Sequence, residues 1–188
     1  MKNIPRADLE SGKETEDQLE TTLHEIFHIL GFSSWVYQYW YDPITNSAYG
    51  TGANRIFENG LTYRGLTTSI LTSPNLLKYA REYYNCADLE GVQLENCKNL
   101  IFFNFLWIIN IIQIEGGGGT LGSHFESAVL ENEFMTGSSI SYSAAISPFS
   151  LNLLKDTGWY DVDMTYHDKI SWGKGKGCDF VRKACQAS

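Results

Sequence analysis

Residues 23–32 read LHEIFHILGF. Apolar residues recur through and around this stretch with a helical spacing: Leu19, Leu23, Ile26, Phe27 and Leu30. Spacings of three and four residues place side chains on one face of an α-helix. A glycine at position 31 is a typical helix end. We therefore predict a helix over residues 18–30.

This helix carries an H-E-x-x-H motif. Residues four apart lie about 40° apart around a helix axis, so His24 and His28 can point at the same ion. Imidazole nitrogen is a common zinc ligand. Glu25 lies about 100° around the axis from His24, which suits a base that takes a proton from zinc-bound water. The structural alternative is a pair of hydrogen-bonded helix histidines beside the core.

A catalytic zinc needs a third protein ligand and an open fourth position. The motif continues as H-E-x-x-H-x-x-G-F, which matches the metzincin opening, whose short form has another histidine three residues after the glycine. That position is Ser34, so the histidine candidates are His124 and His167. His167 matches no motif and is expected on the surface. A carboxylate, from Glu58 or Glu82, is the alternative third ligand.

A second region contains a related pattern. The stretch EGGGGTLGSHFESAVLENEFMTG, residues 115–137, resembles the third-ligand and Met-turn region of leishmanolysin-type metallopeptidases, family M8. That family places its third histidine far from the zinc helix and its Met-turn methionine eleven residues later. His124 and Met135 have this separation. Further similar segments are LETTLHEIFHILGFS, SPFSLNLLKDTGWY and WGKGKGC, so the resemblance covers roughly residues 18–96 and 115–185.

The resemblance implies that His24, His28 and His124 bind one Zn²⁺ per chain. It also implies that Glu25 is the catalytic base, and that Met135 lies beneath the metal without binding it. The implied fold is α+β, a metzincin-like zincin catalytic domain with an active-site helix. The implied activity is that of a zinc-dependent endopeptidase, which hydrolyses peptide bonds in proteins through a zinc-bound water activated by glutamate.

By the same resemblance, the substrates are proteins or peptides, and the full-length protein is extracellular or at the cell surface, in association with membranes. The alternative is a catalytically inactive leishmanolysin-like surface protein that acts in adhesion, or a gene-model fragment. Family members have a signal peptide, a pro-segment and several strands before the zinc helix, and none of these precedes Gln18. We therefore expect a domain truncated at both ends, without a signal peptide.

We divide the chain into three parts. Residues 1–17 are expected to be a polar disordered lead, residues 18–160 the metallopeptidase core, and residues 161–188 the start of a C-terminal cysteine-containing region. Within the core, the Ser-Pro pairs at 73–74 and 147–148 predict the first residues of two further helices, because serine caps a helix and proline fits its first turn.

One segment of the core differs from its surroundings. Residues 99–114 read NLIFFNFLWIINIIQI and carry no charge. Family chains run from Asn96 directly into the glycine stretch, so we expect residues 97–114 to be an insertion or an unremoved intron. A buried pair of strands is one alternative. A membrane span is another, although it usually needs about 20 apolar residues.

The composition restricts the partners. The 188 residues include 14 Lys+Arg and 22 Asp+Glu, a net charge of −8. This balance argues against nucleic acid as a partner, because phosphate binding requires clusters of basic residues. The cysteines contain no C-x-x-C pair, which argues against a cysteine zinc site, and they allow three disulfide connectivities: Cys86, Cys97, Cys178 and Cys185.

Overall fold

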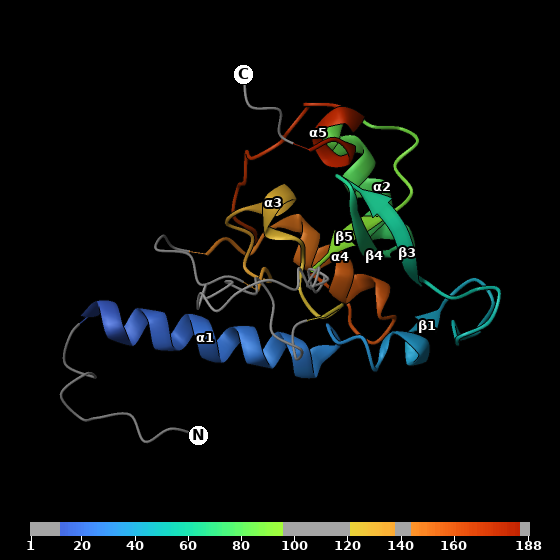
Figure 1. Ribbon diagram of the computed structural model, residues 1–188. Coiled ribbons are helices and arrows are strands. Elements are labelled where there is room, and N and C mark those ends of the chain that lie inside the picture. The colour runs from blue at the N-terminus through green and yellow to red at the C-terminus, as the bar shows by residue number, and fades with distance from the viewer. Residues whose placement is uncertain (1–11, 96–120, 138–143, 185–188) are drawn as a thin grey trace, which may run out of the picture.

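The computed structural model describes residues 12–95, 121–137 and 144–184 (Figure 1). The predicted insertion, residues 97–114, lies outside these ranges, as do residues 1–11. The elements in chain order are α1 (Gly12–Leu30), the 3₁₀ turn η2 (Tyr37–Tyr39), β1 (Tyr41–Asp42), β2 (Ser47–Ala48), β3 (Phe57–Tyr63), β4 (Leu66–Leu71), α2 (Pro74–Tyr84), β5 (Val92–Leu94), α3 (Ser127–Leu130), α4 (Pro148–Asp156) and α5 (Cys178–Arg182). Helices and small sheets are both present, in agreement with the predicted α+β class.

The α1 helix ends where the sequence predicts but begins earlier. Its first residue is Gly12 rather than Gln18, so the predicted start is wrong. Residues 13–18, KETEDQ, lack apolar periodicity, but Lys, Glu and Gln favour helix strongly enough to extend it. At the other end, Gly31 adopts φ +141°, a conformation that favours glycine, and turns the chain back toward the core.

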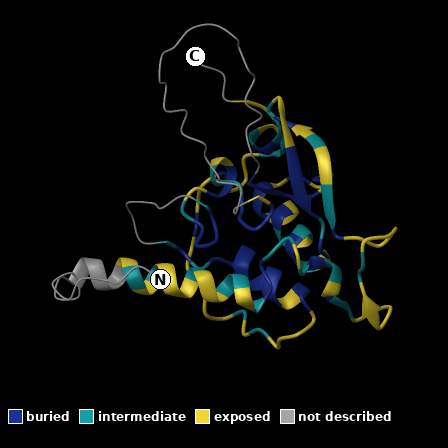
Figure 2. Ribbon diagram, turned by 60° about the horizontal axis from the view of Figure 1, so that its bottom comes forward, coloured by how far each residue is buried: buried dark blue, intermediate teal, exposed yellow. Residues whose placement is uncertain are grey.

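The apolar face of α1 is only partly covered by the described residues. Leu19 is 58% exposed and Ile26 is 40% exposed, whereas Phe27 and Leu30 pack against the core. Figure 2 shows exposed positions along much of the helix. The C-terminal end of α1 is therefore the part that is anchored to the body of the domain.

A three-stranded antiparallel sheet has the order β3-β4-β5. In its register, Leu71 of β4 lies opposite Phe57 of β3 on one side and Val92 of β5 on the other. The end of β5 also forms an isolated bridge, in which Leu94 lies opposite Phe125. This bridge attaches the chain segment that follows His124 to the sheet.

Helices α2 and α4 begin at Pro74 and Pro148, so both predicted starts are confirmed. The two helices pack against each other, and one carboxylate joins them. Asp156, at the end of α4, accepts hydrogen bonds from the backbone N–H groups of Asn75 (3.0 Å) and Leu76 (2.8 Å). These N–H groups belong to the first turn of α2 and have no partner within that helix.

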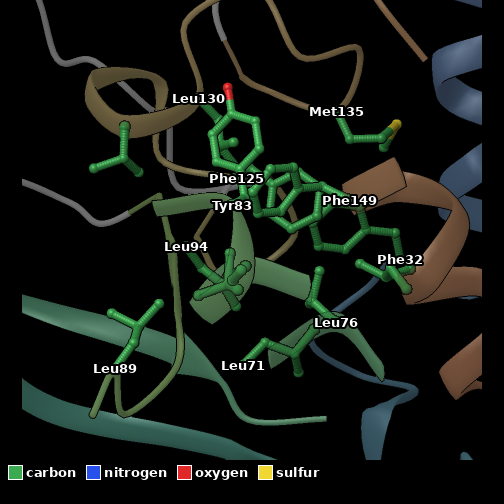
Figure 3. Close-up of a cluster of buried hydrophobic side chains, with 14 of the residues drawn as sticks. Phe32, Leu71, Leu76, Tyr83, Leu89, Leu94, Phe125, Leu130, Met135 and Phe149 are labelled. Atoms are coloured by element: carbon green, nitrogen blue, oxygen red, sulfur yellow. The ribbon is translucent and has the colours of Figure 1, made fainter. Parts of the chain in front are cut away.

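The buried side chains form one cluster that spans the sheet, α2, α4 and the loops between them (Figure 3). Met135 lies at the edge of this cluster and is fully buried. A disulfide joins Cys86, just after α2, to Cys178 at the start of α5. Of the pairings that the sequence left open, this one is formed; Cys97 and Cys185 lie outside the described residues.

The buried contact between α2 and α4 gives a test of the fold. Replacing Asp156 with Ala leaves two backbone donors without their acceptor, one of them buried. Hydrogen bonds to charged groups contribute about 1.5–3 kcal/mol each. We expect the free energy of unfolding to fall by about 2–4 kcal/mol in all, measured by urea denaturation of the metal-free protein. The exposed Asp161→Ala is the matched control and should unfold close to wild type. Equal stability of the two variants would show that the carboxylate does not hold α2 in place.

Candidate metal centre

Three histidines converge on one point. The Nε2 atom of His24 lies 2.9 Å from that of His124 and 3.1 Å from that of His28, and the third separation is also 3.1 Å. Ligand nitrogens about 2.0–2.1 Å from a tetrahedral zinc ion lie about 3.3 Å from one another. The three side chains therefore form a triangle of nearly the size that zinc requires.

The opposite nitrogen of each helix histidine has a backbone acceptor. His24 Nδ1 lies 3.0 Å from the carbonyl oxygen of Phe134, and His28 Nδ1 lies 2.7 Å from that of Phe32. A carbonyl oxygen can only accept, so each Nδ1 carries the proton and donates it. Nε2 is then left with its lone pair, and this is the tautomer that a metal ligand needs.

Backbone geometry explains how His124 reaches the other two. The N–H of Glu95 donates to the carbonyl oxygen of His124 (2.9 Å), and the carbonyl of Glu95 accepts from the N–H of Gly122 (3.2 Å). These bonds extend the pairing at the end of β5 into the His124 segment. The third histidine, 96 residues beyond His28, is thereby fixed above the end of α1.

Burial adjusts the charge state of the site. It lowers the pKa of His24 below its ordinary value, and this effect outweighs the hydrogen bond to Phe134, which acts in the opposite direction. Burial therefore favours the neutral form of His24, which is the form that a metal ligand must have. Glu25 is exposed on the same turn of α1, and its negative charge acts on His24 in the direction of a higher pKa.

The other candidates for the third ligand lie elsewhere. Glu58 forms an ion pair with Arg55 (2.8 Å) on β3, and Glu82 is exposed on α2. His167 is exposed, as expected, with its Nδ1 2.9 Å from the carbonyl oxygen of Asp168. In the described ranges, the histidines grouped closely enough to hold an ion are His24, His28 and His124.

Met135 occupies a turn that is bonded to both sides of the site. Its carbonyl oxygen accepts from the N–H of Phe125 (2.8 Å), the residue after His124. The residue before it, Phe134, supplies the carbonyl that orients His24. The turn therefore links His124 to α1.

Sequence reasoning missed the carboxylate that holds this turn. Glu133 is fully buried, and it accepts hydrogen bonds from the N–H of Met135 (2.6 Å) and from the hydroxyls of Ser147 (3.1 Å) and Ser150 (2.6 Å). Burial raises its pKa to about 7. The sequence feature that could have indicated this contact is the pair of serines on the first turn of the helix predicted to begin at Ser147-Pro148. No local pattern connects these serines to position 133.

Comparison with known proteins gives a consistent result. Residues 1–188 match the family model described as leishmanolysin, Peptidase M8. The chain is 32% identical to a leishmanolysin-like peptidase of Caenorhabditis elegans, with 88% of the chain and 26% of the relative covered. It is 28% identical to one from Drosophila melanogaster (93% and 26%) and 30% identical to a leishmanolysin homolog of Crithidia fasciculata (97% and 23%). The chain thus spans about a quarter of the length of these relatives.

The raised pKa of Glu133 predicts a pH dependence of stability. The folded chain retains a proton up to about pH 7, whereas the unfolded chain releases it near 4.5. The stabilising contribution of Glu133 to the free energy of unfolding is therefore fully present below the pKa that it has in the unfolded chain. It is lost as the pH rises through the pKa that it has in the folded chain. The Glu133→Gln side chain keeps the size and cannot ionise. Between pH 5 and pH 8, the free energy of unfolding of metal-free wild type should fall by roughly 2–3 kcal/mol more than that of this variant.

Urea denaturation at the two pH values measures this difference. Glu131→Gln, an exposed neighbour, is the matched control and should follow wild type at both pH values. If the difference between wild type and Glu133→Gln is the same at pH 5 and pH 8, Glu133 does not titrate in this range.

Proposed function

The chain belongs to the leishmanolysin family of metallopeptidases, and we propose that it carries the zinc site and the catalytic base of a metalloendopeptidase. One observation carries this proposal. The Nε2 atoms of His24, His28 and His124 converge within 3.1 Å of one another, while the carbonyls of Phe32 and Phe134 hold the helix histidines in the ligand tautomer.

The donor set fits zinc better than a hard cation. Imidazole nitrogen is a common ligand for Zn²⁺, whereas Mg²⁺ and Ca²⁺ require oxygen ligands. Three histidines with an open fourth position are typical of catalytic zinc sites, whereas structural zinc sites have four protein ligands. His24, His28 and His124 would hold the ion, and zinc bound there supplies a Lewis acid that polarises the scissile carbonyl.

Glu25 is the proposed general base. Its carboxylate is exposed on the α1 turn that carries His24, so it can be reached by both solvent and substrate. In hydrolysis, this carboxylate takes a proton from the attacking water as the new C–O bond forms. It then gives the proton to the leaving nitrogen as the C–N bond breaks.

We further propose that the fold is that of a metzincin-like zincin. Support comes from the order of the parts: a zinc helix, a sharp turn at Gly31, a distant third histidine and then the turn that contains Met135. The buried Met135 would form the floor beneath the ion, where a polarizable side chain fills space without binding.

The proposed substrates are proteins or peptides, and the proposed location is extracellular or at the cell surface. The Cys86–Cys178 disulfide supports this location, because disulfides persist in oxidising compartments. None of the helices in the described ranges is both long and apolar enough to cross a membrane.

Metal analysis and two matched variants test the proposal. Folded wild type should contain one zinc ion per chain, and His24→Ala should contain little, whereas the exposed His167→Ala should retain wild-type content. Glu25→Gln should keep the zinc but lower peptidase activity by at least about 100-fold, because the amide cannot accept a proton.

Three outcomes would contradict parts of this account. Folded wild type without zinc would exclude the metal site. Activity of Glu25→Gln above the background set by His24→Ala would show that another group is the base. Zinc at full stoichiometry with no turnover by wild type would instead favour the inactive adhesion protein.

A further inference from the structure

We propose that Glu95 is a positioning residue of the metal centre, which orients His124 from the side opposite its ligand atom. This inference rests on the proposed zinc site. The Oε2 atom of Glu95 lies 4.0 Å from Nδ1 of His124, and both side chains are more than nine-tenths buried. The contact is therefore electrostatic and shielded from water.

The same residue also holds the backbone of His124. The N–H of Glu95 donates to the carbonyl oxygen of His124 (2.9 Å), so main chain and side chain of one residue act on one ligand. The two helix histidines have backbone carbonyls opposite their Nδ1 atoms. Near Nδ1 of His124 lies the carboxylate of Glu95. A carboxylate favours the Nδ1–H tautomer more strongly than a neutral carbonyl does, and it makes Nε2 a better electron donor.

The turn around Met135 leaves room for this carboxylate. Gly137 lies two residues beyond Met135, and a Cβ atom built there would overlap the carboxylate oxygens of Glu95. The position accepts glycine because the carboxylate occupies the space of a side chain. The segment from residue 133 to residue 137 thus supplies the Phe134 carbonyl that faces His24 and leaves space for the Glu95 carboxylate.

A bound metal ion would explain why a charged side chain occupies this buried position. Moving a carboxylate out of water is unfavourable unless nearby groups compensate for the lost hydration. A divalent ion bound by the adjacent His124 would supply such compensation through the imidazole ring. The carboxylate should therefore contribute to zinc affinity.

Zinc affinity and metal-free stability must be measured side by side in the full chain. Zinc itself is the probe, in competition with a chromophoric chelator, and Co²⁺ absorption reports the ligand field. Glu95→Gln should bind zinc about 10–100-fold more weakly than wild type, with shifted Co²⁺ bands. Its metal-free unfolding midpoint is measured alongside, so that a loss of zinc affinity can be separated from a loss of stability. Glu82→Gln, an exposed glutamate on α2, is the control and should match wild type in both measurements.

Two further variants keep the test decisive if Glu95→Gln does not fold. Gly137→Ala keeps the carboxylate but displaces it, and it should also weaken zinc binding. Glu95→Asp retains the charge and should recover part of the affinity lost in Glu95→Gln, or in Glu95→Ala if the amide variant is insoluble.

The outcomes separate this inference from the proposed function. Wild type that fails to bind zinc overturns the proposed function itself. Wild type that binds zinc, with Glu95→Gln within twofold of it, overturns only the role of Glu95. A loss of affinity that is matched by an equal loss of metal-free stability, without recovery in Glu95→Asp, also overturns it, because the role would then be structural.

Discussion

The backbone pairing between Glu95 and the segment 122–125 is the constraint on which the candidate site depends. An H-E-x-x-H helix can present two imidazoles by its own geometry, but a third ligand must come from a distant part of the chain. The hydrogen bonds of Glu95 to Gly122 and His124, with the Leu94–Phe125 bridge beyond them, bring that part to the end of β5. The position of the sheet therefore determines the position of the third histidine.

Buried carboxylates then fix the elements around this pairing. Glu133 bonds the turn around Met135 to the start of α4, and Asp156 bonds the end of α4 to the start of α2. Each one accepts hydrogen bonds from groups far away in the sequence. Such acceptors are sensitive parts of a fold, because losing one leaves several buried donors unsatisfied. The turn, the two helices and the ligand segment thus act as one connected support for His24 and His124.

The features that the sequence predicted depend on local signals. Periodicity and a glycine indicated the zinc helix and its end, and Ser-Pro pairs indicated the first residues of α2 and α4. The spacing of His124 and Met135 pointed, only through resemblance to a family, to the segment that the structure places beside His24 and His28. The early start of α1 was missed because helix propensity without apolar periodicity was read as disorder.

The remaining features are contacts between residues far apart in the chain. The serine partners of Glu133 lie 14 and 17 residues away, and the Cys86–Cys178 disulfide joins residues 92 apart. No local pattern specifies such pairs, because they are set by the packing of the whole domain. The carboxylate of Glu95 beside His124 belongs to the same class: its position in the sequence gives no sign that it faces the ring.

X-ray absorption spectroscopy at the zinc edge is the most direct measurement of the central claim. In wild type, the zinc ion is predicted to have a ligand shell of nitrogen and oxygen atoms only, at about 2.0–2.1 Å, with the multiple scattering of three imidazoles. In His124→Ala, the spectrum is predicted to show the scattering of two imidazoles. A shell that contains sulfur at about 2.3 Å, or a wild-type spectrum unchanged by His124→Ala, would contradict the claim that these three histidines form the metal centre.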